Sequence, residues 1–337
     1  MLYYRHASSL EHDPGTMLPE HPDTPERIAA VEAAMERRDW EGCERRDAPA
    51  ADETELTSVH SPGHIAYIRE LAEGGGGGID ADTFVTTASF RAARHAAGGA
   101  CAMVRALLSG EDRAGFCGVR PSGHHAEHDR AMGFCLFNNV AVAAQVAVGE
   151  FGLQRVMIID WDVHHGNGTA EIFRYRRDVL FASIHQAGLF PGTGRVADAG
   201  SRDGLGYTIN APVPKGSDDE VWLSVLEYVI VAAGLEFAPQ LILVSAGFDA
   251  HQDDPIGGCY LDADAFAQMA CQVRELGEQV GAPVGAVLEG GYDPGALAAS
   301  VQATLAALGG EGSAESIAPD PLVTPRLAAH VGHFWTL

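Results

Sequence analysis

The sequence predicts an α/β protein with a mostly parallel central sheet and helices on both faces of it. Apolar segments rich in Val, Ile, Leu and Phe alternate along the chain with longer amphipathic segments, which is the pattern of βαβ units. Two apolar segments, Val156–Ile159 and Leu241–Val244, contain no polar residue, as expected of strands buried on both faces. The 337 residues show no convincing boundary, so we expect one domain over residues 1–337.

The apolar and amphipathic segments define the expected elements. Strands are expected at Gly115–Arg120, Arg155–Asp162, Val179–His185, Tyr207–Pro212, Gln240–Ala246 and Pro283–Glu289. Helices are expected at Pro25–Arg38, Gly63–Glu73, Ser89–Leu108, Asn138–Phe151, Asp218–Phe237, Asp262–Val280 and Pro294–Leu308. The glycine run Gly74–Gly78 is expected to be a flexible loop, because glycine loses much backbone entropy when ordered. Residues 309–337 are polar and contain proline, which predicts a surface tail.

Composition narrows the classes of protein. No run of about 18 apolar residues is present, which argues against a membrane span, and the first residues lack the pattern of a secretory signal. No two of the cysteines form a CxxC pair, so neither a zinc knuckle nor a disulfide framework is indicated. We expect reduced thiols in a cytoplasmic protein. The cysteines are Cys43, Cys101, Cys117, Cys135, Cys259 and Cys271.

The formal net charge of −24 is strongly acidic. Such a surface argues against direct nucleic-acid binding, because it repels phosphates. It is compatible with attraction of cationic substrates such as polyamines or basic peptides. The alternative explanations are solubility and adaptation to a salty cytoplasm.

Polar residues directly after predicted strands are the candidates for chemistry, because ligands of open α/β sheets bind outside the carboxyl ends of the strands. The segment Asp160–Gly168 follows Val156–Ile159. Side chains alternate along an extended chain, so Asp160, Asp162 and His164 project to one side and can reach one cation. The alternative is a solvated strand end or a helix cap.

A second polar segment follows Leu241–Val244. Asp249 is best placed there as a further metal ligand, and His251, Asp253 and Asp254 are alternatives further into the loop. Two carboxylates and one imidazole leave a coordination position open, as catalytic zinc sites require. By itself an Asp in a loop is more often a cap or turn residue.

Two more segments carry polar groups after strands. The adjacent His124 and His125 suit proton transfer near neutral pH, whereas Glu127 and His128 are interpreted as loop polarity. Tyr292, in the loop after Pro283–Val287, could donate its O–H to a developing oxyanion or simply pack against a turn.

Together the segments resemble the histone deacetylase and acetylpolyamine amidohydrolase superfamily, in its class II and bacterial branch. The resemblance covers roughly residues 20–305, leaving 309–337 as a C-terminal tail. It implies an arginase-like fold with about eight strands. The matching motifs, in order, are HPDTPER ending at Arg27, RPSGHH ending at His125, GFCLFNN starting at Gly133, DWDVHHGNG starting at Asp160, FPGTG starting at Phe190, GFDA starting at Gly247 and EGGY ending at Tyr292.

The resemblance assigns roles by matched position. Asp162, His164 and Asp249 would hold zinc, which in this family can also be iron(II). His125 would be the general base and His124 an electrostatic stabiliser, while Tyr292 would donate to the tetrahedral oxyanion.

The resemblance also pairs His124 with Asp160 and His125 with Asn167. An anionic partner raises the pKa of a histidine more than a neutral amide does. We therefore expect His124 to be protonated more readily, and His125 to stay neutral and ready to accept a proton.

Two structural potassium sites are implied as well. The first would be formed by Asp160, Asp162, His164, Ser183 and Ile184, partly through backbone carbonyls. The second would use backbone oxygens of Phe173, Arg176, Val179 and Tyr207.

Matched positions further predict the substrate path. Phe134 and Phe190 would line a narrow acyl-lysine tunnel beside Gly133, with core packing as the alternative for the two rings. Arg27 would lie near an internal acetate exit. Asp82 is matched to an acidic residue that grips the backbone of a peptide substrate.

The substrate class rests on position 256. The eukaryotic polyamine-selective branch has a glutamate there that recognises a distal ammonium, and this chain has Ile256. An acyl-lysine substrate is therefore favoured. The alternatives are a small acylated amine, which bacterial relatives select with loops shared across a homo-oligomer, and a scaffold that binds acyl groups without turnover.

Overall fold

The computed structural model describes residues 1–40 and 42–337. Strands from both ends of this range form one sheet in the order β2-β1-β5-β10-β9-β6-β7-β8, and every pair in it is parallel. The predicted parallel α/β architecture is thus confirmed. The strands are β1 Leu2–Arg5, β2 Glu44–Asp47, β5 Ala114–Cys117, β6 Val156–Asp160, β7 Val179–Gln186, β8 Thr208–Val213, β9 Leu241–Ala246 and β10 Val284–Leu288.

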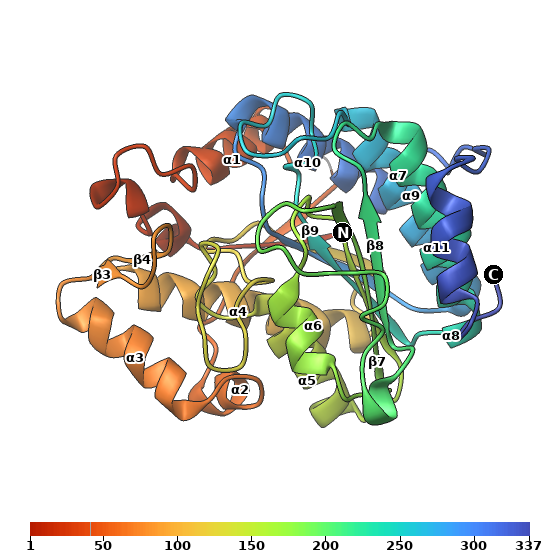
Figure 1. Ribbon diagram of the computed structural model, residues 1–337. Coiled ribbons are helices and arrows are strands. Elements are labelled where there is room, and N and C mark those ends of the chain that lie inside the picture. The colour runs from red at the N-terminus through yellow and green to blue at the C-terminus, as the bar shows by residue number, and fades with distance from the viewer. Residues whose placement is uncertain (41) are drawn as a thin grey trace.

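Helices cover both faces of this sheet (Figure 1). They are α1 Glu26–Arg37, α2 Glu53–Thr57, α3 Pro62–Glu73, α4 Ser89–Leu108, α5 Asn139–Phe151, α6 Asn167–Phe173, α7 Asp219–Val225, α8 Ala232–Phe237, α9 Ala263–Val280, α10 Pro294–Leu308 and α11 Val323–Val331. Among the described residues, no helix combines the length and the apolar character needed to cross a membrane.

The alternation of side chains along the strands divides the interior into two cores. Met157 and Ile159 of β6 pack with residues of α1, α9 and α10, whereas Val156 and Ile158 pack with residues of α4 and α5. Strand β6 is therefore buried on both faces, which explains its unbroken apolar sequence.

The structure corrects several expected elements. Strand β2 was missed because its sequence Glu-Arg-Arg-Asp is charged, as is typical of a sheet edge. The glycine run is not wholly a loop, since β3 (Gly77–Gly78) pairs with β4 (Phe84–Val85). The helix expected at Asp218–Phe237 contains a π-helical stretch, Leu226–Val231, between α7 and α8. The expected tail includes helix α11, which contacts α7 and β8.

The order of the central strands positions the functional residues. Strands β5, β10, β9 and β6 are neighbours in the sheet and run in the same direction. The loops that follow them therefore meet at one edge of the sheet, although they lie up to about half the chain apart in sequence.

Helix α4 approaches the segment before α2 through its backbone. A Cβ at Gly98 would lie 2.2 Å from the Pro49 oxygen and 2.3 Å from the Ala51 nitrogen. Ala51 N donates to Arg94 O at 2.8 Å, and Arg94 Nε donates to Ala51 O at 2.8 Å. Only glycine leaves room for this contact.

Gly98→Ala is therefore expected to destabilise the protein by about 1–3 kcal/mol, because the added methyl group overpacks the contact. Urea unfolding measures this. The matched control is Gly149→Ala, at an exposed position of α5 where nothing lies within 4 Å of the new Cβ. That change should be neutral or stabilise by up to about 1 kcal/mol. An equal gain in both variants would contradict the close approach.

Candidate active site

Three buried side chains converge at the carboxyl ends of β6 and β9. His164 Nδ1 lies 3.0 Å from Asp162 Oδ1 and 3.0 Å from Asp249 Oδ2. Together the three residues offer ligand atoms that all lie within 4.8 Å of one another. The structure therefore brings together the three residues that the sequence motifs single out as metal ligands.

The alternative ligands in the loop after β9 have other contacts. Asp254 accepts hydrogen bonds from the backbone N–H groups of Ile256 (2.9 Å) and Tyr292 (2.7 Å). Asp253 is exposed and lies 3.7 Å from His251. Neither these carboxylates nor His251 belongs to a metal-sized cluster among the residues that the structure describes. Asp254 instead ties the loop after β9 to the loop after β10, a role that sequence reasoning missed.

The electrostatics of the triad suit a cation. Burial and the charge of Asp162 raise the pKa of Asp249 to about 7. Burial alone would lower the pKa of His164, but the hydrogen bonds with Asp162 and Asp249 raise it to about 10. A proton on His164 thus offsets the two buried carboxylates, and a divalent cation would offset them better. One imidazole and two carboxylates form a donor set that fits zinc or iron(II).

The backbone holds the two carboxylates in place. Gly290 N donates to Asp162 Oδ2 at 2.8 Å, and Val163 N donates to Asp249 Oδ1 at 2.8 Å. A Cβ at Gly290 would lie 2.1 Å from Asp249 Oδ2, so this approach requires glycine. These contacts orient the remaining carboxylate oxygens toward His164.

Two histidines lie beside the triad, and each ring has its own hydrogen-bonding partner. His124 Nδ1 lies 3.0 Å from Asp160 Oδ2, and His125 Nδ1 lies 2.8 Å from Asn167 Oδ1. Burial opposes protonation of His124, but the charges of Asp160 and Asp162 outweigh it and raise the pKa well above its usual value. Burial and the neighbouring His124 and His164 lower the pKa of His125 well below its usual value.

Glu289 is a functional residue that sequence reasoning missed. Its Oε2 accepts from the backbone N–H groups of Gly123 (2.6 Å) and His124 (3.2 Å), and Oε1 accepts from Ser245 Oγ at 3.1 Å. Burial raises the pKa of this carboxyl group to about 7. Its position directly after the apolar strand β10 was the available signal. Glu289 anchors the backbone that carries His124.

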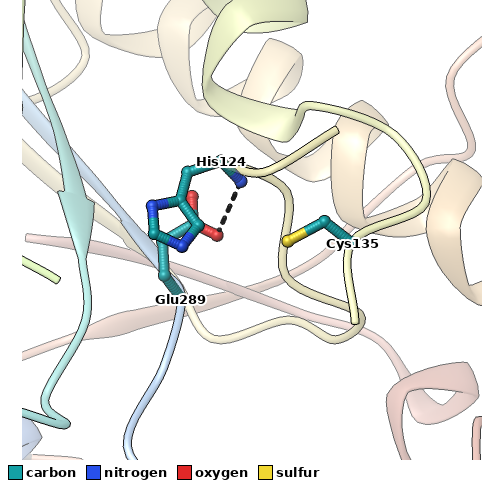
Figure 2. A group of neighbouring side chains, drawn as sticks. All are labelled: His124, Cys135 and Glu289. Atoms are coloured by element: carbon teal, nitrogen blue, oxygen red, sulfur yellow. Dashed lines mark hydrogen bonds between the residues drawn. The ribbon is translucent and has the colours of Figure 1, made fainter. Parts of the chain in front are cut away.

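Cys135 lies beside Glu289 and His124 (Figure 2). Its Sγ contacts Ser122 Oγ at 3.5 Å, and burial raises the pKa of the thiol well above its usual value. Backbone N–H groups already occupy the Glu289 carboxylate, and Asp160 already pairs with the His124 ring. The group is therefore a hydrogen-bonded support of His124 and lacks the free, ionised ligands of a metal site.

Arg27 supports the loop that carries Tyr292. It is fully buried and donates to the carbonyl oxygens of Gly291 (2.5 Å) and Glu289 (2.6 Å). Its guanidinium lies 4.5 Å from the centroid of the Tyr292 ring, and it pairs with Asp23. Burial raises the pKa of Tyr292 well above its usual value, so the phenol is neutral and able to donate.

Two aromatic rings flank the catalytic groups. The Phe190 ring is perpendicular to His125, with centroids 5.1 Å apart, and the Phe134 ring meets Tyr292 edge-on at 5.6 Å. Gly133 contacts both His125 and Phe190 closely enough that a Cβ would lie 2.4 Å from His125 Cδ2. Phe190 therefore packs against the candidate base, and Phe134 packs against the candidate oxyanion donor.

Asp82 and Ile256 lie in neighbouring loops. Thr83 Oγ1 donates to Asp82 Oδ1 and accepts from Phe134 N, each at 3.2 Å, which places Asp82 beside the Phe134 loop. Ile256 is partly exposed and follows Asp254, which holds Tyr292. Asp82 is therefore linked to the Phe134 loop through Thr83, and Ile256 is linked to the Tyr292 loop through Asp254.

The positions expected to bind potassium lie on adjacent elements. Ser183 of β7 is paired in register with Asp160 of β6. In the second group, Phe173 O accepts from Arg176 N at 2.9 Å, and Tyr207 O accepts from Phe181 N at 3.0 Å. Cation binding at these two groups stays a prediction.

Comparisons with known proteins identify the family of this chain. The histone deacetylase domain family matches residues 21–308. The chain belongs to this family. It is 42% identical over 259 residues to a probable deacetylase of Methanothermobacter thermautotrophicus, with 76% of each chain covered. It is 39% identical over 249 residues to a histone deacetylase-like amidohydrolase of Pseudomonas aeruginosa, covering 73% of this chain and 66% of the relative.

The fold also matches a solved structure. The crystal structure of the HDA15 HD domain superposes with a TM-score of 0.90 at 33% identity, covering 99% of this chain and 94% of the other. The protein is therefore an enzyme of the deacetylase and amidohydrolase class.

Asp249→Asn is expected to abolish tight binding of one metal ion, because it removes a charged ligand from the triad. Elemental analysis of the purified variant after dialysis measures this. Asp253→Asn is the matched control, since it removes an exposed carboxylate four residues away. A full metal complement in Asp249→Asn, or its loss in Asp253→Asn, would contradict the assignment of the ligands.

Proposed function

We propose that the protein is a zinc-dependent deacylase that hydrolyses the acetyl, or other small acyl, amide of an acyl-lysine side chain. The proposal rests on the position of the metal-binding triad next to two histidines that have different partners. The triad of Asp162, His164 and Asp249 lies against a histidine with an anionic partner and a second histidine with a neutral partner. Amide hydrolysis needs both an acceptor and a donor of protons near the scissile bond.

His125 is the proposed general base. Its Nδ1 is engaged by Asn167, and its pKa is depressed, so Nε2 can accept a proton from the attacking water. The same nitrogen then delivers this proton to the amide nitrogen as the carbon–nitrogen bond breaks, so that the lysine leaves as a neutral amine. The His125 ring is buried and packs against Phe190, which limits the access of bulk water to the base.

His124 and Tyr292 are proposed to stabilise the charge that develops during attack. His124 carries a positive charge opposite Asp160, and its Nε2 lies 3.8 Å from Asp162 Oδ1. Tyr292 keeps its phenolic proton, so its O–H can donate a hydrogen bond to the oxyanion. Arg27 and Asp254 fix the loop from which Tyr292 projects.

The triad residues would hold the metal ion. When bound, zinc would supply Lewis acidity, polarising the acyl oxygen and lowering the pKa of water. The donor set accommodates iron(II) as an alternative metal. The residues of the two groups described above, including Ser183 and Ile184, are proposed to bind structural potassium.

Position 256 supports an acyl-lysine substrate over an acetylated polyamine. Ile256 offers no charge to a distal ammonium group. The strong net negative charge attracts cationic substrates of both kinds, so it does not separate them. Phe134 and Phe190 are proposed to contact the alkyl chain of the lysine, Asp82 to contact the peptide backbone, and Arg27 to lie along the exit of the released acetate.

Asn167→Asp is expected to shift the acidic limb of the kcat/KM profile to higher pH. A carboxylate beside Nδ1 favours the imidazolium form and raises the pKa of His125, and the base must be neutral to act. The profile is measured between pH 5 and 10. The combined variant with Glu127→Gln removes the adjacent carboxylate as a competing partner. An unmoved limb in both variants would overturn the assignment of His125.

The substrate is tested by comparing kcat/KM for an acetyl-lysine peptide, an N-acetylated polyamine and a longer acyl-lysine peptide. We expect the acetyl-lysine peptide to be preferred over the polyamine, and His125→Ala to lower its rate at least about 100-fold. Preference for the polyamine would favour the alternative amidohydrolase. Equal rates in wild type and His125→Ala would refute the mechanism.

A further inference from the structure

The Asn167 amide bridges two groups. Its Oδ1 lies 2.8 Å from His125 Nδ1, and its Nδ2 donates to Glu127 Oε1 at 2.8 Å. The other neighbours of Nδ2, the His125 carbonyl oxygen and Met132 Sδ, each lie at 3.4 Å. The contact with Glu127 is therefore the short, charge-assisted one.

Glu127 determines which way the amide faces. An ionised carboxylate can only accept hydrogen bonds, so the NH₂ group of Asn167 must face it. The amide oxygen then faces His125, and an oxygen can only accept from Nδ1–H. The proton of neutral His125 is thereby placed on Nδ1, and Nε2 keeps its lone pair. A flipped amide would set oxygen against the carboxylate and NH₂ against Nδ1, which would favour the proton on Nε2.

The backbone of Glu127 is itself held in place. Its N–H donates to Arg130 O at 2.9 Å, and its carbonyl oxygen lies 2.9 Å from His60 Nδ1. Burial lowers the pKa of His60 to about 3, so this ring is neutral and donates from Nδ1. The other His60 nitrogen, Nε2, accepts from Asn138 N at 2.8 Å, which agrees with that tautomer.

We propose that Glu127 is a positioning residue that fixes the Asn167 amide and thereby the tautomer of His125 in which Nε2 is free. This role rests on the proposed function of His125 as general base. Among the residues that the structure describes, the Glu127 carboxylate hydrogen-bonds to Asn167 and to no member of the triad, so its proposed effect on His125 passes through the Asn167 amide.

The direct test is the tautomer of His125, read from two-bond ¹H–¹⁵N spectra of protein labelled in histidine, in metal-free and zinc-loaded samples. Wild type should carry the proton on Nδ1. Glu127→Ala should show a mixture with the Nε2–H tautomer. The isosteric Glu127→Gln should lie between them, because its amide oxygen can still accept from Asn167. An unchanged tautomer in both variants would overturn the proposal, whatever happens to the rate.

Kinetics with the acetyl-lysine peptide provide the second measurement. Glu127→Ala should lower kcat about 10-fold with little change in KM, and combining it with Asn167→Ala should cost no more than Asn167→Ala alone. Glu171→Gln is the matched control. Its carboxylate lies on the same side of the site but accepts from His128 N instead of Asn167, and it should leave kcat unchanged.

The two measurements separate the proposals. If wild type hydrolysed no acyl-amine, the proposed function would fail, and the tautomer spectra would still decide the role of Glu127. A loss of kcat without a change of tautomer, or additive losses in the double variant, would show a merely structural contribution and contradict the proposal.

Discussion

The active site depends on how negative charge is buried at one edge of the sheet. Four carboxylates, each at most 1% exposed, lie at or just after the ends of β6, β9 and β10: Asp160, Asp162, Asp249 and Glu289. Burial of an isolated carboxylate costs several kcal/mol, so each one needs a partner. The loops after the strands provide partners through backbone N–H groups, and at Gly290 the close approach of the backbone requires glycine.

The four carboxylates are offset in different ways. Glu289 is held by N–H groups and a hydroxyl, and Asp160 faces the His124 ring. Asp162 and Asp249 both point at His164, whose pKa rises to about 10 in response. Asp162 and Asp249 also accept backbone N–H groups, from Gly290 and Val163, but both direct their second oxygen at the same imidazole. These three groups offer ligand atoms within 4.8 Å of one another, which is the arrangement that a divalent cation would complete.

The two histidines differ because their partners differ. His124 contacts an anion and His125 contacts an amide, and their pKa values are displaced in opposite directions. Two adjacent residues of one loop can thereby hold opposite protonation states at the same pH. The Asn167 amide that contacts His125 donates in turn to the carboxylate of Glu127, which we propose orients it.

The sequence predicted the elements whose signal is local. Strands β6 and β9 are unbroken apolar runs, and the polar residues after them meet as expected for parallel strands. What it could not show are contacts between distant segments. Glu289 reaches the backbone of Gly123 across 166 positions, and Arg27 reaches Gly291 across 264. Glu127 was interpreted as an ordinary polar loop residue, because its partner Asn167 lies forty positions away in the sequence.

The central claim is that the buried triad is completed by a divalent cation. It is tested most directly by the melting temperature of metal-stripped protein during titration with zinc at pH 7. A ligand that binds only the folded state stabilises it by about 2.7 kcal/mol at 100 times Kd, so the melting temperature should rise with zinc concentration. The rise should vanish when Asp162 is replaced by asparagine. A melting temperature independent of zinc in the wild-type protein would contradict the account.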